Sequence, residues 1–503
     1  MDISHWISHW ADWDSDRIAV HFEGQDISYG EMEIRVNCLA AMLSGQLNVG
    51  KGDRVAHLGY NSPELLELLF ACARLGAMLV PLNWRLAPPE HAWILQNCES
   101  KALLAEPDFV DHLNSIRDEM PDLAIIVYGG GDQWHSYDDL LTAAGADAGG
   151  GTLDDPVTIV YTSGTTGRPK GTLLTQDALF HNAVNAIAAH DITRHDHGLT
   201  VLPMFHVGGM NIHTTPSIYA GATTTIQARF DPANTLTAIS ERKPTIFLTV
   251  PAMTLGLISH PNWETTDLSS LRLVGIGSSA VPEAVLRAFL IRGVPATQIY
   301  GLTESAPVAI CLPLEDVERK MGSCGKPALH TRARIVDNYG IPVAPGEVGE
   351  IVLLGKNLFQ AYWRNEEGTR EAYTGGWFHT GDIGHQDEDG YYYVDERKKD
   401  VVISGGENIY PAELENILAD CTDLLEAAVI GRPDEHWGEI PVACVVRRPG
   451  SYIQSADILE LFEGRLARFK HPRRVIFLET LPRNTMGKVE KFTLREKFEA
   501  NSP

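Results

Sequence analysis

The chain lacks the features that mark secreted, membrane-spanning and metal-stabilised proteins. Its 7 cysteines include no C-x-x-C pair, which argues against a zinc site or a disulfide framework and favours a reducing compartment. The first residues carry neither a basic stretch nor an apolar run, so they do not resemble a secretory signal. No apolar run approaches the roughly 20 residues that span a bilayer. We therefore expect a cytoplasmic protein.

Positive charge is also scarce. The chain has 41 Lys and Arg residues against 66 Asp and Glu residues, which gives a net charge of −25. So acidic a surface disfavours binding to nucleic acid or to anionic membranes. Any phosphate-rich ligand must then be held by local basic groups.

Length and hydrophobic patterning predict an α/β protein with more than one domain. A chain of 503 residues is too long for a single core. Strand-like and helix-like segments alternate from about residue 16 to 98 and again beyond residue 171, which predicts βαβ units with parallel sheets. Residues 333–354 change to short strands and turns, which predicts a β-rich subdomain.

The last hundred residues predict a separate, small α+β domain. A charged run at residues 395–400 lies between two strand-like stretches, and taken alone it would be a solvated connection. Beyond it we expect a helix at 411–418, strands at 425–430 and 441–446, a helix at 456–466 and a strand at 475–477. We therefore predict an N-terminal domain of residues 1–397 and a C-terminal domain of residues 398–503.

The most informative stretch is YTSGTTGRPKG at residues 161–171, which follows an apolar run at 157–160. Glycines let a backbone approach a phosphate closely, hydroxyls and amides donate to its oxygens, and a lysine adds charge. The pattern is not a Walker A loop, because Lys170 is followed by Gly171 and Thr172. A generic turn between strands could look similar, but the residues match SGTTG-x-PKG. The stretch predicts a phosphate-binding loop.

Further motifs follow in order: YGLTE at 300–304, WFHTGD at 377–382, SGGEN at 404–408 and PRNTMGKV at 482–489. With them the chain, from about residue 53 to 494, resembles acyl-CoA synthetases of the adenylate-forming superfamily. Within that superfamily, its motifs most resemble those of bacterial fatty-acyl-CoA and feruloyl-type CoA ligases. The resemblance implies two steps: a carboxylate attacks the α-phosphate of ATP to give acyl-AMP and pyrophosphate, and the CoA thiol then displaces AMP. It also implies that the small C-terminal domain is mobile.

The resemblance implies roles in the first step for residues of the N-terminal domain. The phosphate loop would hold the departing β- and γ-phosphates through Thr162, Ser163, Gly164, Thr165, Thr166, Gly167 and Lys170. Thr303 would contact the α-phosphate, and Glu304 with Thr166 would bind Mg²⁺. The adenine would lie against Gly277, Ser278, Ser279, Ala280, Tyr300 and Gly301. Asp382 would accept the ribose hydroxyls and Arg397 would reach the ribose or a phosphate. A plain turn or helix start is the simpler explanation of each motif alone.

The resemblance implies further roles around the domain boundary. Lys399 would be the hinge residue, and Lys488 would bridge the carboxylate and the α-phosphate during adenylation. Gly405 and Gly406 would let pantetheine pass the backbone. In the basic cluster at residues 465–474, Arg473 would bind the CoA nucleotide with Trp437 nearby, although a helix-end charge cluster is an equal alternative.

The substrate acid is less well specified. A strand is expected at residues 200–202, and His206, expected at the end of a strand, would lie beside the acyl carboxylate. The positions expected to line the acyl pocket are small or apolar: Val207, Gly208, Gly209, Met210, Thr249, Ile276 and Ala309. A second carboxylate or an amine would need a buried counter-charge, so we expect a fatty or an aromatic acid, with ATP, Mg²⁺ and CoA as cofactors.

Two alternatives remain open at the level of sequence. A related ligase could load a carrier-protein thiol instead of CoA, and a luciferase-like oxidase or an AMP-binding sensor belongs to a different class. A sensor should lack Lys488 or Glu304, and both are present. The sequence does not fix the oligomeric state, and a homodimer is compatible with it.

Overall fold

The computed structural model describes most of the chain. The residues described are 1–129, 135–137, 149–162, 169–277, 281–397, 400–404, 407–434, 437–463, 465–466, 468–484 and 489–499. Two compact units emerge: Met1–Arg332 with Leu353–Phe378, and Ala333–Val352 with His379–Pro503. This division groups the β-rich segment with the C-terminal residues. The expected hinge at Lys398 and Lys399 lies outside the described residues, so the boundary there stays a prediction. Among the described helices, none is long and apolar enough to cross a membrane.

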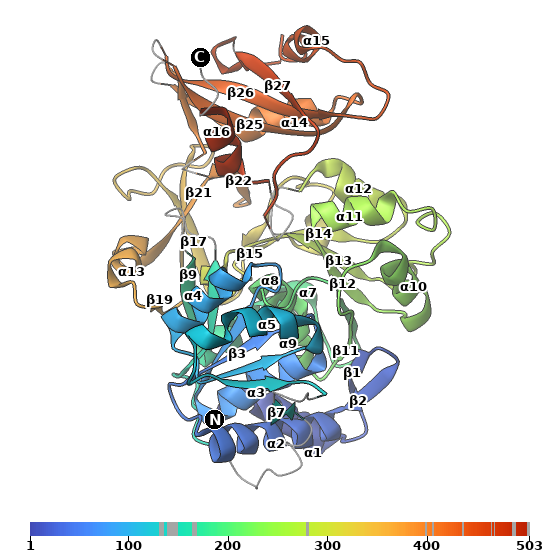
Figure 1. The fold of residues 1–503 in the computed structure, drawn as a ribbon. Helices are drawn as coiled ribbons and strands as arrows, with labels where there is room; N and C mark the ends of the chain where they lie inside the picture. The colour runs from blue at the N-terminus through green and yellow to red at the C-terminus, as the bar shows by residue number, and fades with distance from the viewer. Residues whose placement is uncertain are drawn as a thin grey trace. The chain divides into compact units, whose positions relative to one another are not determined.

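The larger unit contains a nine-stranded sheet in the order β16-β15-β14-β13-β12-β10-β11-β1-β2 (Figure 1). Its strands are β1 (Ile18–Phe22), β2 (Gln25–Ser28), β10 (His197–Thr200), β11 (Thr223–Ile226), β12 (Ile246–Thr249), β13 (Leu273–Gly277), β14 (Ala296–Tyr300), β15 (Ile310–Cys311) and β16 (Lys326–Pro327). From β1 through β14 the neighbouring pairs are parallel. Their carboxyl ends therefore share one edge, where open α/β sheets bind ligands.

A second sheet of the larger unit has eight strands in the order β19-β9-β8-β4-β3-β5-β6-β7. Its strands are β3 (Arg54–Leu58), β4 (Met78–Leu82), β5 (Ala102–Ala105), β6 (Ala124–Val127), β7 (His135–Ser136), β8 (Pro156–Thr162), β9 (Lys170–Thr175) and β19 (Ala361–Tyr362). Strand β8 is parallel to β4, whereas β9 returns antiparallel to β8 and places Lys170 opposite Thr162. The two arms of the predicted phosphate loop are thus adjacent strands.

Helices between the two sheets form the main core. They are α1 (His5–Trp13), α2 (Tyr29–Leu47), α3 (Pro63–Leu75), α7 (Gln176–His190) and α9 (Thr215–Ala220), and their apolar side chains pack with strand residues of both sheets. Helix α3 is buried along nearly its whole length, as expected of a helix whose surface is mostly apolar. Ser62 caps its start and accepts a hydrogen bond from the Leu65 amide at 3.4 Å.

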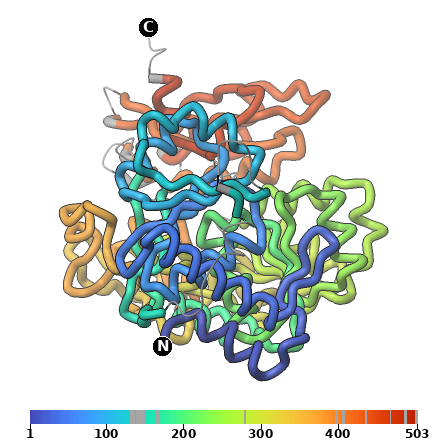
Figure 2. The backbone as a smooth tube through the Cα atoms, turned by 60° about the horizontal axis from the view of Figure 1, so that its bottom comes forward, coloured from blue at the N-terminus to red at the C-terminus, as the bar shows by residue number. Residues whose placement is uncertain are grey.

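Outer helices cover the opposite faces of the sheets. Side chains alternate along a strand, so Val55 of β3 joins the inner core whereas Ala56 packs under α4 (Pro88–Cys98) and α5 (Val110–Ile116). On the first sheet, β13 packs through Val274 and Ile276 against α10 (Pro232–Arg242), α11 (Pro251–Ile258) and α12 (Glu283–Ile291). These three helices lie together in both views, in green (Figures 1 and 2). The larger unit is a five-layered α/β stack, which confirms the predicted class.

Two further sheets complete the fold. The third has the order β17-β18-β21-β20, with β22 beside β21. Its elements are β17 (Thr331–Val336), β18 (Gly349–Gly355), α13 (Glu366–Ala372), β20 (Tyr373–Thr374), β21 (Trp377–Gln386) and β22 (Tyr392–Arg397). The fourth has the order β24-β23-β26-β25, with β27 beside β26. Its elements are β23 (Val402–Ser404), β24 (Glu407–Ile409), α14 (Pro411–Ala419), β25 (Leu424–Asp434), β26 (Gly438–Arg447), α15 (Ser455–Glu460), β27 (Arg474–Leu478) and α16 (Lys491–Glu499).

Two sequence expectations about elements are wrong in position. The strand expected at residues 200–202 is β10, which ends at Thr200. The backbone beyond it leaves the sheet because its polar groups bond to Asn61 and not to a neighbouring strand. Asn61 Nδ2 donates to the Leu202 carbonyl at 2.9 Å, and Asn61 Oδ1 accepts from the Met204 amide at 2.7 Å. The helix expected at 456–466 stops at Glu460, where hydrogen bonds three residues apart tighten the chain into turns.

Candidate active site

The predicted site residues of the larger unit lie at the carboxyl ends of parallel strands. Tyr300 is the last residue of β14, and Gly277 is the last residue of β13. The loop after β10 leads to His206, and β8 ends at Thr162. Ser278, Ser279 and Ala280 of the predicted adenine wall are outside the described residues, as are Ser163, Gly164, Thr165, Thr166 and Gly167 of the phosphate loop.

One tyrosine links the end of the phosphate loop to the predicted magnesium ligand. The hydroxyl of Tyr362 donates to Glu304 Oε1 at 2.8 Å, and the ammonium of Lys170 lies 5.2 Å from the centroid of the Tyr362 ring. The pairing of β19 with β9 places Tyr362 there, opposite Thr172. The Phe359 amide also donates to the Glu304 carbonyl at 2.8 Å. A cation and a carboxylate are thereby held close together, as a metal–phosphate site requires.

The turn that carries Glu304 is closely packed. It is η4 (Thr303–Ser305), and a Cβ at Gly301 just before it would lie 1.5 Å from the Pro307 carbonyl oxygen, so only glycine fits. The Ser305 hydroxyl accepts from the Leu302 amide at 2.9 Å and donates to the Leu302 carbonyl at 3.1 Å. These contacts fix Thr303 and Glu304 in the turn that follows β14.

His206 does not end a strand, contrary to the sequence expectation. Strand β10 stops at Thr200, and His206 instead begins the short helix α8 (Val207–Gly209). Its Nε2 is buried and has no hydrogen-bond partner among the described residues. Burial, with a smaller contribution from the charge of Arg85, lowers the pKa of His206 to about 3. The imidazole is therefore neutral at pH 7 and can offer a ring N–H to an acceptor.

Arg85 is a residue that sequence reasoning missed. It follows β4, and its guanidinium carbon lies 4.2 Å from the centroid of the Trp84 ring and 5.8 Å from that of Phe205. It is exposed, and no described carboxylate pairs with it. An unpaired arginine beside His206 is notable in so acidic a chain, because it leaves a positive charge available to an anion. The only sequence signal was a basic residue just after a predicted strand.

The residues expected to line the acyl pocket differ in the room they leave. Val207, Met210, Ile276 and Ala309 are buried. A Cβ at Gly208 would meet only Leu202 Cδ2, at 3.8 Å, whereas a Cβ at Gly209 would lie 2.3 Å from the Pro203 carbonyl oxygen. Gly208 thus leaves space and Gly209 does not. The chain then continues into η3 (Met210–Thr214), a π-helical turn of a kind frequent at functional sites.

The smaller unit holds the predicted ribose contact. Asp382 is 3% exposed on β21, and its amide donates to Thr380 Oγ1 at 3.0 Å. Strand pairing places Arg397 of β22 opposite Asp382, although the side chain of Arg397 is not described. Glu350 holds the neighbouring turn by accepting from the Gly381 amide at 3.0 Å.

The basic cluster at residues 465–474 divides in two. The guanidinium of Arg473 lies 5.6 Å from the centroid of the Trp437 ring, so the predicted CoA pair is brought together. Arg465 forms an ion pair with Asp420 at 2.6 Å, and Lys470 forms one with Glu413 at 2.6 Å, so structural pairing explains these two. Lys399, Gly405, Gly406 and Lys488 lie outside the described residues.

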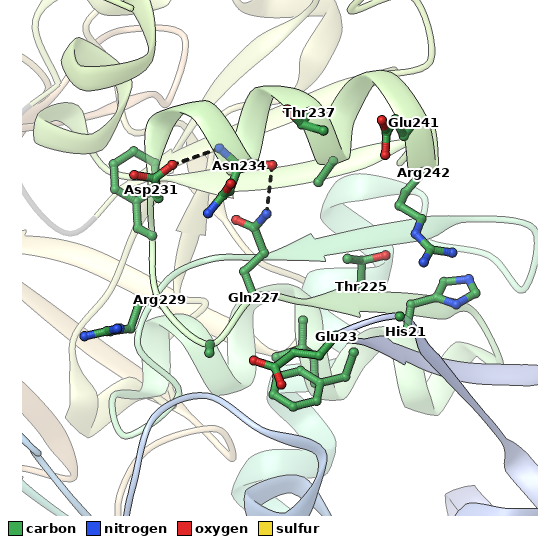
Figure 3. A pocket seen from close by; sticks show the side chains of 16 residues that line it. His21, Glu23, Thr225, Gln227, Arg229, Asp231, Asn234, Thr237, Glu241 and Arg242 are labelled. Carbon is green, nitrogen blue, oxygen red and sulfur yellow. Dashed lines mark hydrogen bonds between the residues drawn. The ribbon is translucent and has the colours of Figure 1, made fainter. Parts of the chain in front are cut away.

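A cavity of about 700 Å³ lies elsewhere in the larger unit, where β1 and β11 meet α10. In Figure 3, Gln227 crosses it toward Asn234, whose carbonyl accepts the Gln227 amide at 3.1 Å. Acidic and basic side chains share the lining: Glu23, Asp231 and Glu241 with His21, Arg229 and Arg242. None of the predicted site residues lines it, so we do not place the reaction there.

Comparisons with known proteins show the family of the chain. The AMP-binding enzyme family matches residues 7–363, and the AMP-binding enzyme C-terminal domain matches residues 413–488. The chain is 46% identical over 501 residues to an indoleacetate–CoA ligase from Aromatoleum aromaticum, covering 99% of this chain and 98% of that protein. It is 37% identical over 483 residues to the long-chain-fatty-acid–CoA ligase FadD13 from Mycobacterium tuberculosis, covering 95% of this chain and 94% of that protein.

The fold is similar to a solved structure as well. The crystal structure of the anthranilate CoA ligase AuaEII in complex with anthranoyl-AMP matches with a TM-score of 0.93 at 28% identity, covering 100% of this chain and 98% of that one. Similarity over nearly the full length of the chain leads to one conclusion. The chain belongs to the AMP-binding enzyme family and is an AMP-forming acid–CoA ligase, which uses ATP to activate a carboxylic acid as an acyl-AMP and then transfers the acyl group to CoA.

Proposed function

We propose that Lys170, Thr303 and Glu304 hold Mg²⁺-ATP for the adenylation step. The observation that carries this proposal is the Tyr362 ring, which hydrogen-bonds Glu304 at 2.8 Å and has Lys170 5.2 Å from its centroid. Among the described residues no group of three His, Cys, Asp or Glu side chains could hold a metal. A single carboxylate with phosphates and water is the usual set of ligands for Mg²⁺ beside a nucleotide.

In the same proposal, the chain's groups act mainly by position and charge. The hydroxyl of Thr303 donates to the α-phosphate, and Lys170 offsets charge on the departing pyrophosphate. The neutral His206 offers its ring N–H to the acid carboxylate, which then attacks the α-phosphorus as the bond to pyrophosphate breaks. Preorganised donors aimed at developing charge supply much of the rate in such reactions. Mg²⁺, when bound, neutralises phosphate charge.

The acid is proposed to be aromatic, of the arylacetic class that includes indoleacetate. The identity to the indoleacetate–CoA ligase, 46%, exceeds that to FadD13, 37%, over nearly the whole chain in both cases. A Cβ at Gly208 would meet only the buried Leu202, at 3.8 Å, which leaves room there for a flat ring. A long-chain fatty acid is the second candidate.

We also propose roles for the residues expected to bind the ribose and CoA and to move the C-terminal domain. Asp382 with Arg397 would bind the ribose, and Arg473 with Trp437 would bind the CoA nucleotide. Lys488 would act in the first step, with Lys399 as the hinge that brings Gly405 and Gly406 into use for the second. A cytoplasmic location and a homodimer remain part of the proposal.

A panel of acids tests the substrate class. We expect kcat/KM for CoA-dependent AMP formation to be at least tenfold higher with indoleacetate or phenylacetate than with decanoate or palmitate, because a misfit of even one methylene group in a shaped apolar pocket costs on the order of 1–3 kcal/mol. A higher kcat/KM for the fatty acids would reject the aromatic assignment.

The space beside Gly208 makes a narrower prediction. Gly208→Phe should lower kcat/KM for the preferred aromatic acid by roughly tenfold to a hundredfold, since a benzyl group would occupy the place of the substrate ring. The effect on acetate should be much smaller. Gly45→Phe, at an exposed position of α2 with no atom within 4 Å of the added Cβ, is the control. Equal losses for aromatic and short acids would place Gly208 outside the acyl pocket.

A further inference from the structure

A buried network of asparagine side chains surrounds the turn that carries Glu304. Asn182, Asn185 and Asn357 are each 0% exposed. Asn182 and Asn185 are three residues apart on α7, so they project from one face of the helix. Asn357 follows β18, far away in the sequence. Buried amides of this kind are costly unless every donor and acceptor is satisfied.

The network holds the chain on both sides of the turn. Asn357 Nδ2 donates to the Ser305 carbonyl at 2.8 Å. The Val308 amide donates to Asn182 Oδ1 at 2.8 Å, and Asn185 Nδ2 donates to the Val308 carbonyl at 3.0 Å. Ser305 is the residue after Glu304, so these bonds fix the exit from the turn.

The same network is anchored at its far side. The hydroxyl of Thr331 accepts from Asn185 Nδ2 at 3.0 Å and donates to Asn357 Oδ1 at 2.9 Å. The His330 amide donates to Asn185 Oδ1 at 2.7 Å, which fixes the orientation of the Asn185 amide because its nitrogen could not accept that bond. The network therefore has one arrangement.

Between its anchors lies a residue whose backbone is strained. Ala306 has φ of 71° and is 0% exposed, a left-handed conformation that costs an L-residue with a side chain of its own. Such a conformation persists only when its surroundings impose it. Here the Ser305 and Val308 backbone groups on either side of Ala306 are the ones bound by the asparagines.

Asn182 also reaches a second segment of the site. Its Nδ2 donates to the Asn211 carbonyl at 2.6 Å. Asn211 lies in η3, directly after α8 and His206. The Asn182 amide thus bonds through its oxygen to the chain just after the Glu304 turn and through its nitrogen to the segment that follows His206.

We propose that Asn182 and Asn185 are positioning residues for adenylation: both set the place of Glu304, and Asn182 alone also ties that turn to the acid-binding segment. The inference rests on the proposed role of Glu304 in binding Mg²⁺-ATP. Neither asparagine touches substrate in this scheme. Each acts through the backbone next to a residue that does.

Kinetic constants for the two half-reactions test the proposal. Asn182→Leu and Asn185→Leu should each raise KM for Mg²⁺-ATP about tenfold or more, since small displacements of a reacting geometry are costly. Asn182→Leu should also raise KM for the acid, and Asn185→Leu should not. Thioester formation from a synthetic acyl-adenylate and CoA should keep its KM for CoA. Asn182→Asp keeps the oxygen that accepts from the Val308 amide and loses the NH₂ group that donates to the Asn211 carbonyl. It should therefore raise KM for the acid more than KM for Mg²⁺-ATP. If the leucine variant does not fold, this variant tests the proposal in its place.

Gln176→Met is the matched control. Gln176 is also buried on α7, but its side chain bonds Ile3 and Ala73, at 2.8 Å each. It should lower the melting temperature and leave both KM values unchanged. Glu304→Gln is run alongside. If Glu304→Gln raises KM for Mg²⁺-ATP and the asparagine variants do not, the positioning role is overturned. If Glu304→Gln itself has no effect, the proposed function fails instead.

Discussion

Replacing Glu304 with glutamine should lower the rate of acyl-adenylate formation by about 100- to 1000-fold, the range seen when a group that stabilises transition-state charge is removed. Glutamine has nearly the same shape and can still accept the Tyr362 hydrogen bond, which is 2.8 Å long. It cannot supply the negative charge that holds a divalent cation against the phosphates. The measurement is pyrophosphate release in a single turnover with saturating acid.

The two half-reactions separate this explanation from general damage. Thioester formation from a synthetic acyl-adenylate needs no pyrophosphate and no cation on it, so Glu304→Gln should change that step little. Raising the Mg²⁺ concentration should restore part of the adenylation rate. Equal losses in both half-reactions would contradict the assignment. Glu315→Gln, at an exposed carboxylate of the next turn, η5 (Leu314–Asp316), is the control and should behave as the parent.

Tyr362→Phe gives a graded version of the same test. The phenylalanine keeps the ring beside Lys170 and removes only the hydroxyl that donates to Glu304. Because the carboxylate remains, we expect only a severalfold loss of adenylation, in line with a hydrogen bond worth about 1 kcal/mol. A loss as large as that of Glu304→Gln would mean that the hydroxyl itself contacts the nucleotide.

The local chemistry of the site was readable from the sequence, but its connections were not. Glycine and hydroxyl residues at 161–171 and the Gly301 turn have short-range patterns. The structure places Thr162 and Lys170 at strand ends, and it places Glu304 in the turn η4 that follows β14. Tyr362 has no local signature. It reaches Glu304 only because β19 pairs with β9, and pairing between segments so far apart leaves no periodic trace in a single sequence.

The same limit explains the errors. Strand β10 was placed too late because the apolar residues after Thr200 look like a strand, while Asn61 satisfies their backbone groups from another part of the chain. Arg85 was missed because stacking on Trp84 and Phe205 depends on two loops meeting. The asparagines of α7 read as ordinary helix residues until their partners are known. The choice of acid rests on shape, and a sequence gives the pocket's residue types without its dimensions.

Acidification should unfold the larger unit. Burial lowers the pKa of several histidines below the usual value of about 6.5: His57 and His206 to about 3, His91, His190 and His197 to about 4, and His213 well below its usual range. The unfolded chain binds protons at these sites below pH 6.5 and the folded chain does not. Stability is therefore complete above pH 6.5 and is lost as the pH falls from about 6.5 toward 4.

Two carboxyls, one buried and one half-buried, act in the opposite sense. Burial raises the pKa of Glu67 and of Glu106 to about 7, so the folded chain binds these protons between pH 7 and 4.5 and gains stability there as the pH falls. The six histidines outnumber them. Each unbalanced proton is worth about 1.4 kcal/mol per pH unit, so the free energy of unfolding should fall by a few kcal/mol per pH unit below 6.5. At that slope, the whole free energy of unfolding of an ordinary domain is lost within two or three pH units.

Urea unfolding at pH 7.5, 6.5 and 5.5 measures this slope. The midpoint should fall steeply between pH 6.5 and 5.5 at nearly constant m-value, because the change acts on stability and not on the exposed area. His57→Phe removes one buried imidazole, whose Nε2 has no hydrogen-bond partner among the described residues. It should flatten the slope by about one proton, roughly 1.4 kcal/mol per pH unit. His195→Gln, at an exposed histidine, should leave the slope unchanged. A midpoint that is flat or rises on acidification would contradict this account, because the folded chain would then bind as many protons as the unfolded chain over that range.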